Sequence, residues 1–88
     1  MRKLIKRVLI VPPAGLVGNW QAELQKLFRL PFQTIRGNTV KDENPFTQAG
    51  NDLAIISVDT LWRERIRTFY QDAPPYDLVI FDEAHKLS

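Results

Sequence analysis

The sequence predicts an α/β fold built on a parallel sheet. Short apolar runs rich in β-branched residues occupy positions 8–11, 53–58 and 78–81, and each run is continuous rather than alternating. Continuous runs of this length are typical of strands that are buried on both faces, as in a parallel sheet. Helical periodicity fills the segments between them, which is the alternation of βαβ units. We therefore expect one small domain of three layers, with about four parallel strands and flanking helices.

The strands differ in how clearly the sequence marks them. The runs VLIV at 8–11, LAIISV at 53–58 and LVIF at 78–81 are apolar throughout or nearly so. The segment FQTI at 32–35 is shorter in apolar content and is a weaker fourth candidate. Residues 37–51 are rich in Asn, Gly and Pro and predict a connection with little regular structure.

Two helices are expected, at residues 16–28 and 61–70. In each, apolar residues recur at steps of one, three and four, so that they form one stripe along the helix. The expected core residues of the two stripes are Leu16, Val17, Trp20, Leu24, Leu27 and Phe28, and Leu61, Trp62, Ile66, Phe69 and Tyr70. Pro31 and Pro74 follow the two helices, where proline cannot continue them. Residues 1–6 look like the last turns of a further amphipathic helix, which predicts more chain upstream.

Composition excludes several classes of protein. The 88 residues contain no cysteine, so a disulfide framework and a thiolate metal site are excluded, and a reducing cytoplasm (bacterial or archaeal cytosol) is expected. No apolar run approaches the roughly 20 residues that a membrane-spanning helix needs, so we expect no membrane partner. The net charge of +2 discriminates little. The local basic segments at 1–7 and 63–67 are more informative about partners.

The strongest chemical signal is an acidic pair at the end of the last predicted strand. Asp82 and Glu83 directly follow LVIF, and Ala84 and His85 come next. Ligands of parallel sheets bind beyond the carboxyl ends of the strands. A carboxylate there suits Mg²⁺ bound to substrate phosphates, and a second one can deprotonate an attacking water. The alternative is an ordinary helix start, because the helix dipole favours acidic residues in a first turn.

Three segments together resemble one family. The string LVIFDEAH at 78–85 resembles motif II of the superfamily-two helicases and translocases, whose ATP-binding domain is a RecA-like P-loop NTPase fold. RVLIVPPAGLVGNWQAEL at 7–24 resembles motif Ia of the Swi/Snf-type ATPases, and DLAIISVDTL at 52–61 resembles their motif Ib. The bacterial branch typified by the RNA-polymerase-associated translocase is the most similar in style. The motifs cover nearly the whole chain, in the family's order.

The resemblance implies roles for particular residues. In motif II, Asp82 would bind magnesium through water, Glu83 would be the catalytic base for ATP hydrolysis, and His85 would couple the nucleotide site to DNA contacts. Motifs Ia and Ib contact the backbone of the nucleic acid, expected here to be double-stranded DNA, at helix starts that suit phosphates. The matching positions in this chain are Pro13, Ala14, Gly15, Ser57 and Thr60.

Some of these residues have a structural alternative. Ser57 is also suited to be a helix N-cap with no DNA role. Arg63, Arg65 and Arg67 suit phosphate contacts, but they are more typical of the solvated face of a helix.

Parts that this family needs are absent from the sequence. A P-loop requires G-x-x-x-x-G-K-[ST], and none of the four glycines is followed by lysine. We therefore expect residues 1–88 to be a fragment of the helicase ATP-binding domain that contains motifs Ia, Ib and II. ATP and Mg²⁺ would be cofactors of the longer protein, whose remainder would be a partner of this segment. Alone, the chain is expected to be inactive, and to self-associate through the exposed edge of strand 78–81.

Two other functions remain open at this point. A non-catalytic nucleic-acid-binding or interaction module could retain the helicase scaffold without its ATPase. A receiver-like signalling domain also places acidic residues at strand ends around magnesium, and would need a phosphate-accepting aspartate, for which Asp59 is the nearest candidate.

Overall fold

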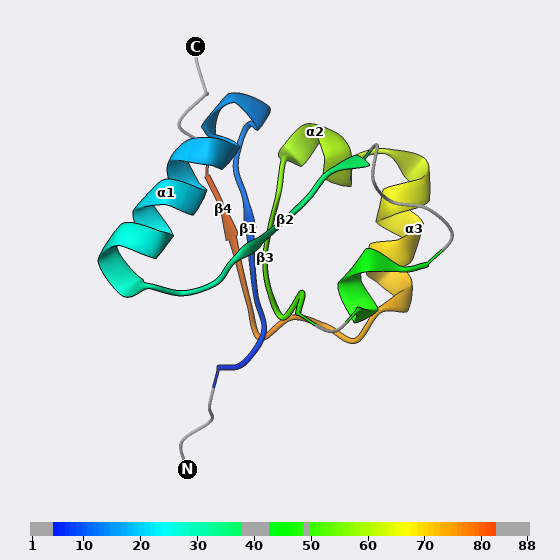
Figure 1. Cartoon of the computed structure of the whole chain (residues 1–88). Coiled ribbons are helices and arrows are strands. Elements are labelled where there is room, and N and C mark those ends of the chain that lie inside the picture. The colour runs from blue at the N-terminus through cyan, green and yellow to red at the C-terminus, as the bar shows by residue number, and fades with distance from the viewer. Residues whose placement is uncertain (1–4, 38–42, 49, 83–88) are drawn as a thin grey trace.

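The computed structural model of the chain describes residues 5–37, 43–48 and 50–82. Its centre is a four-stranded sheet in the order β2-β3-β1-β4, and every neighbouring pair of strands is parallel (Figure 1). The strands are β1 (Val8–Val11), β2 (Gln33–Ile35), β3 (Leu53–Ile56) and β4 (Leu78–Phe81). The predicted parallel sheet is therefore confirmed, including its weak strand at 33–35.

Helices cover both faces of this sheet. Helix α1 (Val17–Phe28) lies against one face, and α2 (Val58–Leu61) and α3 (Glu64–Asp72) lie against the other (Figure 1). Short 3₁₀ turns include η1 (Ala14–Leu16), before α1, and η3 (Pro45–Thr47), before β3. The arrangement is the three-layer α/β fold that the sequence predicts, and it is consistent with part of a RecA-like domain. Within the described ranges, no helix is long and apolar enough to cross a membrane.

Successive residues of the central strands supply both layers of the core. Leu9 and Val11 of β1 face the α2–α3 side, whereas Ile10 faces α1. Strand β3 alternates in the same way, with Ala54 and Ile56 on one side and Ile55 on the other. All of these side chains are buried, which explains why the runs are apolar without alternation.

The prediction of one continuous helix at residues 61–70 is wrong. The chain forms two helices, α2 and α3, because Arg63 takes an extended conformation between them. Trp62, which we expected in the core, is 62% exposed at this break. Strand β3 is also shorter than predicted and stops at Ile56, since Ser57 already caps α2.

The described part of the segment at 37–51 has little regular structure, as predicted, but its short turn η3 places Phe46, only 1% exposed, in the core with Tyr70 and Tyr76. Two further expectations need correction. The prediction that the apolar stripe of α1 is buried to its end is wrong, since Leu27 and Phe28 are exposed. Residues 5 and 6 are not helical, so the predicted helical tail is wrong there, and its first four residues lie outside the described ranges.

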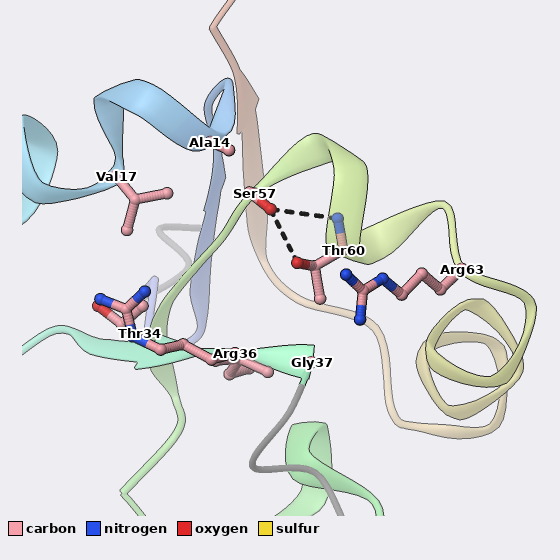
Figure 2. A pocket seen from close by; sticks show the side chains of 9 residues that line it. Ala14, Val17, Thr34, Arg36, Gly37, Ser57, Thr60 and Arg63 are labelled. Carbon is pink, nitrogen blue, oxygen red and sulfur yellow. Dashed lines mark hydrogen bonds between the residues drawn. The ribbon is translucent and has the colours of Figure 1, made fainter.

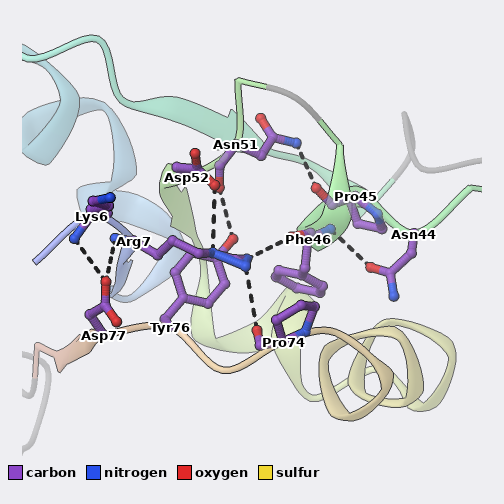
Figure 3. Close-up of polar contacts among 10 residues, drawn as sticks. All are labelled: Lys6, Arg7, Asn44, Pro45, Phe46, Asn51, Asp52, Pro74, Tyr76 and Asp77. Atoms are coloured by element: carbon purple, nitrogen blue, oxygen red, sulfur yellow. Dashed lines mark hydrogen bonds and ion pairs between the residues drawn. The ribbon is translucent and has the colours of Figure 1, made fainter.

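The amino ends of the strands are closed by a polar network around Arg7 (Figure 3). The Arg7 guanidinium lies over the Tyr76 ring, and its Nη2 donates a hydrogen bond of 2.7 Å to the carbonyl oxygen of Phe46. The Asp77 carboxylate accepts hydrogen bonds from the backbone N–H groups of Lys6 and Arg7. This end of the sheet is filled by the protein's own contacts, whereas ligands of parallel sheets bind at the opposite, carboxyl end of the strands.

Candidate functional site

The three predicted motif segments meet at the carboxyl ends of the strands, a region we call the carboxyl rim. The end of β1 lies at its centre. The Val58 N–H, after β3, donates to Pro12 O at 2.9 Å, and the Asp82 N–H, after β4, donates to Val11 O at 3.1 Å. Residues far apart in the sequence are thus joined directly to the turn that follows β1.

Asp82 lies at this rim, as predicted. Its Oδ2 accepts a hydrogen bond of 2.8 Å from the indole Nε1 of Trp20 on α1. Asp82 and Trp20 both line a cavity of about 370 Å³ together with Leu16, Asn19 and Glu23. Glu83 and His85, the other two predicted residues of the tetrad, lie outside the described residues.

Asp82 offers a single carboxylate to a magnesium ion. Among the described residues, no group of three or more His, Cys, Asp or Glu side chains could form a complete metal site. Mg²⁺ does not require one, because it usually keeps several waters and is held by one or two carboxylates plus substrate phosphates. Asp82 therefore fits as a carboxylate that would hold magnesium with the help of a nucleotide.

A second cavity lies at the same rim on the side of β2 and β3. It has a volume of about 360 Å³ and combines small residues with two arginines (Figure 2). Its lining consists of Ala14, Val17, Thr34, Ile35, Arg36, Gly37, Ser57, Thr60 and Arg63. We call it the arginine pocket. The guanidinium groups of Arg36 and Arg63 make this lining positively charged, which suits an anion.

Arg63 depends on its neighbours for its place in the arginine pocket. Its side chain extends from the α2–α3 junction towards Thr60 and Gly37 (Figure 2). A Cβ atom at Gly37 would collide with the Arg63 guanidinium. Glycine at position 37 therefore allows Arg63 to lie against the end of β2.

The chain is similar in sequence to several known proteins. The chain is 39% identical over 87 residues to the uncharacterized ATP-dependent helicase YqhH of Bacillus subtilis, covering 99% of this chain and 14% of that protein. It is 35% identical over 92 residues to the DNA repair and recombination protein RAD54B of Mus musculus, with 98% and 10% covered. It is 30% identical over 88 residues to the RNA polymerase-associated protein RapA of Sodalis glossinidius, with 94% and 9% covered.

Over nearly its whole length, the chain is homologous to helicases of the Swi/Snf type of superfamily two. The predicted resemblance is thereby confirmed. No family profile and no solved structure matches the chain significantly. The chain spans 9% to 14% of the length of these relatives.

The three segments predicted as motifs can be placed on the elements. The predicted motif Ia runs from β1 through η1 into α1, the predicted motif Ib runs from β3 into α2, and the predicted motif II begins on β4. Asp59, the candidate of the receiver-like alternative, lies in the first turn of α2 rather than at the end of a strand, and is exposed.

The motif Ia residues lie on one turn. Pro13 is the N-cap of η1, and its carbonyl oxygen accepts a hydrogen bond of 2.9 Å from the Leu16 N–H. Ala14 lines the arginine pocket, and Gly15 beside it is exposed. Of these three residues, Ala14 alone borders the cavity, and the other two flank it in sequence.

The motif Ib residues are engaged with each other. Ser57 is the N-cap of α2, as the structural alternative for this residue predicts, and its Oγ accepts from the Thr60 N–H at 3.1 Å. The Ser57 hydroxyl is also 2.9 Å from Thr60 Oγ1. Both residues are buried and line the arginine pocket. Their first role is therefore to fix the start of α2.

Sequence reasoning missed two features of this site. Arg36 and Gly37 were not identified, because they belong to no motif and follow the weakest strand. Trp20 was assigned to the core, and it does pack partly buried against Ile10, Val17 and Leu24. Its hydrogen bond to Asp82 could not be anticipated, since nothing in the sequence shows that the two residues meet.

Proposed function

We propose that this chain is a segment of the ATP-binding domain of a nucleic-acid-dependent ATPase or translocase that acts on double-stranded DNA. One observation carries the proposal. Motifs Ia, Ib and II converge on one rim and are joined there by the hydrogen bonds from Val58 to Pro12 and from Asp82 to Val11. A fold that connects its nucleotide residue to its nucleic-acid residues in this way suits coupling between the two ligands.

The β4 side of the rim is the proposed nucleotide side. Bound magnesium would neutralise negative charge on the phosphates of ATP. Asp82 would hold the ion through water, and Glu83 would accept the proton of the water that attacks the γ-phosphate. As the water oxygen bonds to phosphorus, the bond from phosphorus to the ADP oxygen breaks. His85 would transmit the state of the nucleotide site towards the DNA contacts.

The arginine pocket is the proposed nucleic-acid side. Arg36 and Arg63 supply positive charge, and Ala14, Ser57 and Thr60 line the same cavity, beside Pro13 and Gly15. Guanidinium groups and helix starts both suit phosphate oxygens. Contacts of this kind position a duplex without reading its sequence, so we expect binding to depend on salt rather than on base sequence.

Further chain is needed for catalysis. The relatives are far longer than the segment matched here, and the sequence contains no P-loop motif. We propose that the P-loop, the second RecA-like lobe and its arginine finger come from the remainder of a longer protein. The 88 residues alone would not hydrolyse ATP, because positioning and charge neutralisation require all these parts together. The proposed location is the cytoplasm, where DNA and ATP are both available.

The experiment is an ATPase titration of the longer protein. We expect duplex DNA to stimulate hydrolysis more than single-stranded DNA does, and stimulation to weaken at the higher of two salt concentrations. Glu83→Gln should abolish hydrolysis while DNA binding persists. Hydrolysis that survives Glu83→Gln, or that the 88 residues support alone, would contradict the proposal. DNA binding without any ATPase activity in the wild type would favour a non-catalytic binding module instead.

A further inference from the structure

A hydrogen bond joins Trp20 and Asp82, two residues that lie 62 positions apart in the sequence. Trp20 lies on the first turn of α1, the helix that begins directly after the η1 turn of motif Ia. Asp82 follows the last residue of the edge strand β4. The bond therefore connects the helix that starts at the proposed nucleic-acid turn with the carboxylate of the proposed nucleotide side.

Packing alone does not account for a tryptophan at this position. The ring contacts the apolar cluster of Ile10, Val17, Leu24, Phe32 and Ile55, a role that phenylalanine or leucine could also fill. What tryptophan adds is an indole N–H, and this group donates to Asp82 Oδ2 at 2.8 Å. Hydrogen bonds to an ionised carboxylate are stronger than those between neutral groups, so this one restricts the orientation of the carboxylate.

Asp82 is held from two sides. Its backbone N–H donates to Val11 O at the end of β1, and its side chain accepts from Trp20. Val11 and Trp20 both belong to the motif Ia segment, since β1 leads through η1 into α1. A displacement of the η1 turn on binding DNA would therefore reach the Asp82 carboxylate through α1 and Trp20.

We propose that Trp20 is a positioning residue that orients the Asp82 carboxylate for the magnesium-bound nucleotide and couples it to nucleic-acid contact at motif Ia. The inference rests on the proposed function, and adds to it a residue and a route of coupling. Outer-shell partners of metal-binding carboxylates fix their orientation, and their loss typically weakens metal binding about 10- to 100-fold. Magnesium bound through water should lie at the lower end of that range.

The first experiment tests the bond itself, by NMR on the 88-residue chain. The chain has two tryptophans, so Trp62→Phe leaves Trp20 as the only indole. In that background, Asp82→Ala should shift the indole ¹H–¹⁵N signal upfield and speed its hydrogen exchange about tenfold. Asp72→Ala, on the exposed end of α3, is the matched control and should change neither. If Asp82→Ala changes neither the indole ¹H–¹⁵N shift nor its exchange rate, the inference is overturned.

The second experiment tests positioning, in the longer protein proposed above. An ATP analogue with a fluorescent ribose label reports nucleotide binding while magnesium is titrated. Trp20→Phe should raise the magnesium concentration for half-maximal binding about tenfold, and should lower the factor by which DNA stimulates hydrolysis. Trp62→Phe removes an exposed indole that lies outside the Asp82 cavity, and should leave both quantities at the wild-type level.

A further variant separates the N–H group from ring shape. Benzothienylalanine at position 20 keeps the two fused rings and replaces the indole N–H with sulfur, so it should behave like Trp20→Phe. If wild type and both phenylalanine variants show the same magnesium dependence, positioning by Trp20 is refuted while the proposed function stands. If the wild type shows no magnesium-dependent nucleotide binding, the proposed function itself is refuted, and the inference with it.

Discussion

The guanidinium carbon of Arg7 lies 4.1 Å from the centroid of the Tyr76 ring, so that a cation covers an aromatic face at the amino end of the sheet (Figure 3). The same guanidinium bonds the Phe46 carbonyl through Nη2. It thereby connects β1, the η3 segment and the chain that leads into β4. An ion pair of 3.5 Å from Arg7 Nε to the mostly exposed Asp52 adds little, because exposed pairs are weak.

Arg7→Lys should destabilise the fold even though it keeps the charge. Lysine lacks the planar fork that covers Tyr76 and reaches Phe46 O, so a cation–π contact and a hydrogen bond are lost. We expect the free energy of unfolding in urea to fall by about 2 kcal/mol. Lys6→Ala is the control, since the hydrogen bond of Lys6 to Asp77 uses its backbone N–H, and its side chain is exposed. Equal losses in the two variants would contradict this account.

Tyr76 should make stability fall at alkaline pH. Burial raises the pKa of Tyr76 above its ordinary value of 10.0, although the nearby Arg7 opposes the shift. Above that ordinary value, the unfolded chain ionises at Tyr76 before the folded chain does. The free energy of unfolding is therefore fully retained below pH 10 and decreases as pH rises towards the raised pKa.

Tyr76→Phe isolates this contribution. At pH 8 the variant should be less stable by about 1 kcal/mol, because Tyr76 Oη no longer donates to Asn51 O. Between pH 9.5 and 11 the wild type should lose stability more steeply than the variant, as measured by urea unfolding. Parallel pH profiles for the two proteins would show that Tyr76 ionisation contributes nothing.

Ser57→Ala tests the N-cap of α2. The Thr60 N–H loses its acceptor at a buried helix start, so we expect the free energy of unfolding to fall by about 1 kcal/mol. Thr68→Ala is a matched control, because its hydroxyl only donates to the Glu64 carbonyl on the exposed side of α3. Ser57→Thr keeps a capping hydroxyl and should recover most of the loss. If it restores stability but DNA binding stays weak, Ser57 also contacts the nucleic acid directly.

The sequence was sufficient for those parts of the structure that depend on local pattern. Strands β1 and β4 have the predicted bounds because continuous apolar runs between turns specify buried strands. The break at Trp62 was missed, because the periodicity of α2 runs on into α3 and a single extended residue, Arg63, interrupts it. Burial of Phe46 was missed because it depends on contacts with Tyr70 and Tyr76, which lie 24 and 30 positions away.

The same distinction applies to the candidate site. Asp82 could be located from its place after an apolar strand, since parallel strands bring their carboxyl ends to one edge. The arginine pocket could not, because its residues come from β2, Gly37 and the α2–α3 junction, and only the folded chain brings them together. The sequence pattern therefore predicts that a residue such as Asp82 lies at the carboxyl end of a strand. Which residues surround it depends on how the folded chain packs.

Gly37→Ala and Arg63→Gln should both weaken DNA binding by the longer protein. Arg63→Gln removes a charge, so the slope of log affinity against log salt should fall by about 1. Gly37→Ala retains all charges but displaces the Arg63 guanidinium, and should weaken binding less. Lys26→Gln, near the other end of α1, is the charge-matched control and should leave the affinity almost unchanged. Equal effects of Lys26→Gln and Arg63→Gln would indicate general attraction rather than a site.

The edge of β4 should cause self-association of the 88-residue chain. Strand β4 pairs with β1 on one side and has no strand on the other in the described sheet, and Leu78 and Phe81 are 41% and 54% exposed. An apolar edge of this kind is a template for another chain, and an inserted lysine discourages such pairing. Leu78→Lys should therefore weaken the dimer that we expect in sedimentation velocity, by about tenfold or more. Phe28→Lys removes an equally apolar side chain, 62% exposed at the end of α1, and should leave the dimer intact if the strand edge is the contact. A wild-type chain that stays monomeric at high concentration, or two variants that dissociate equally, would show that β4 is not the surface involved.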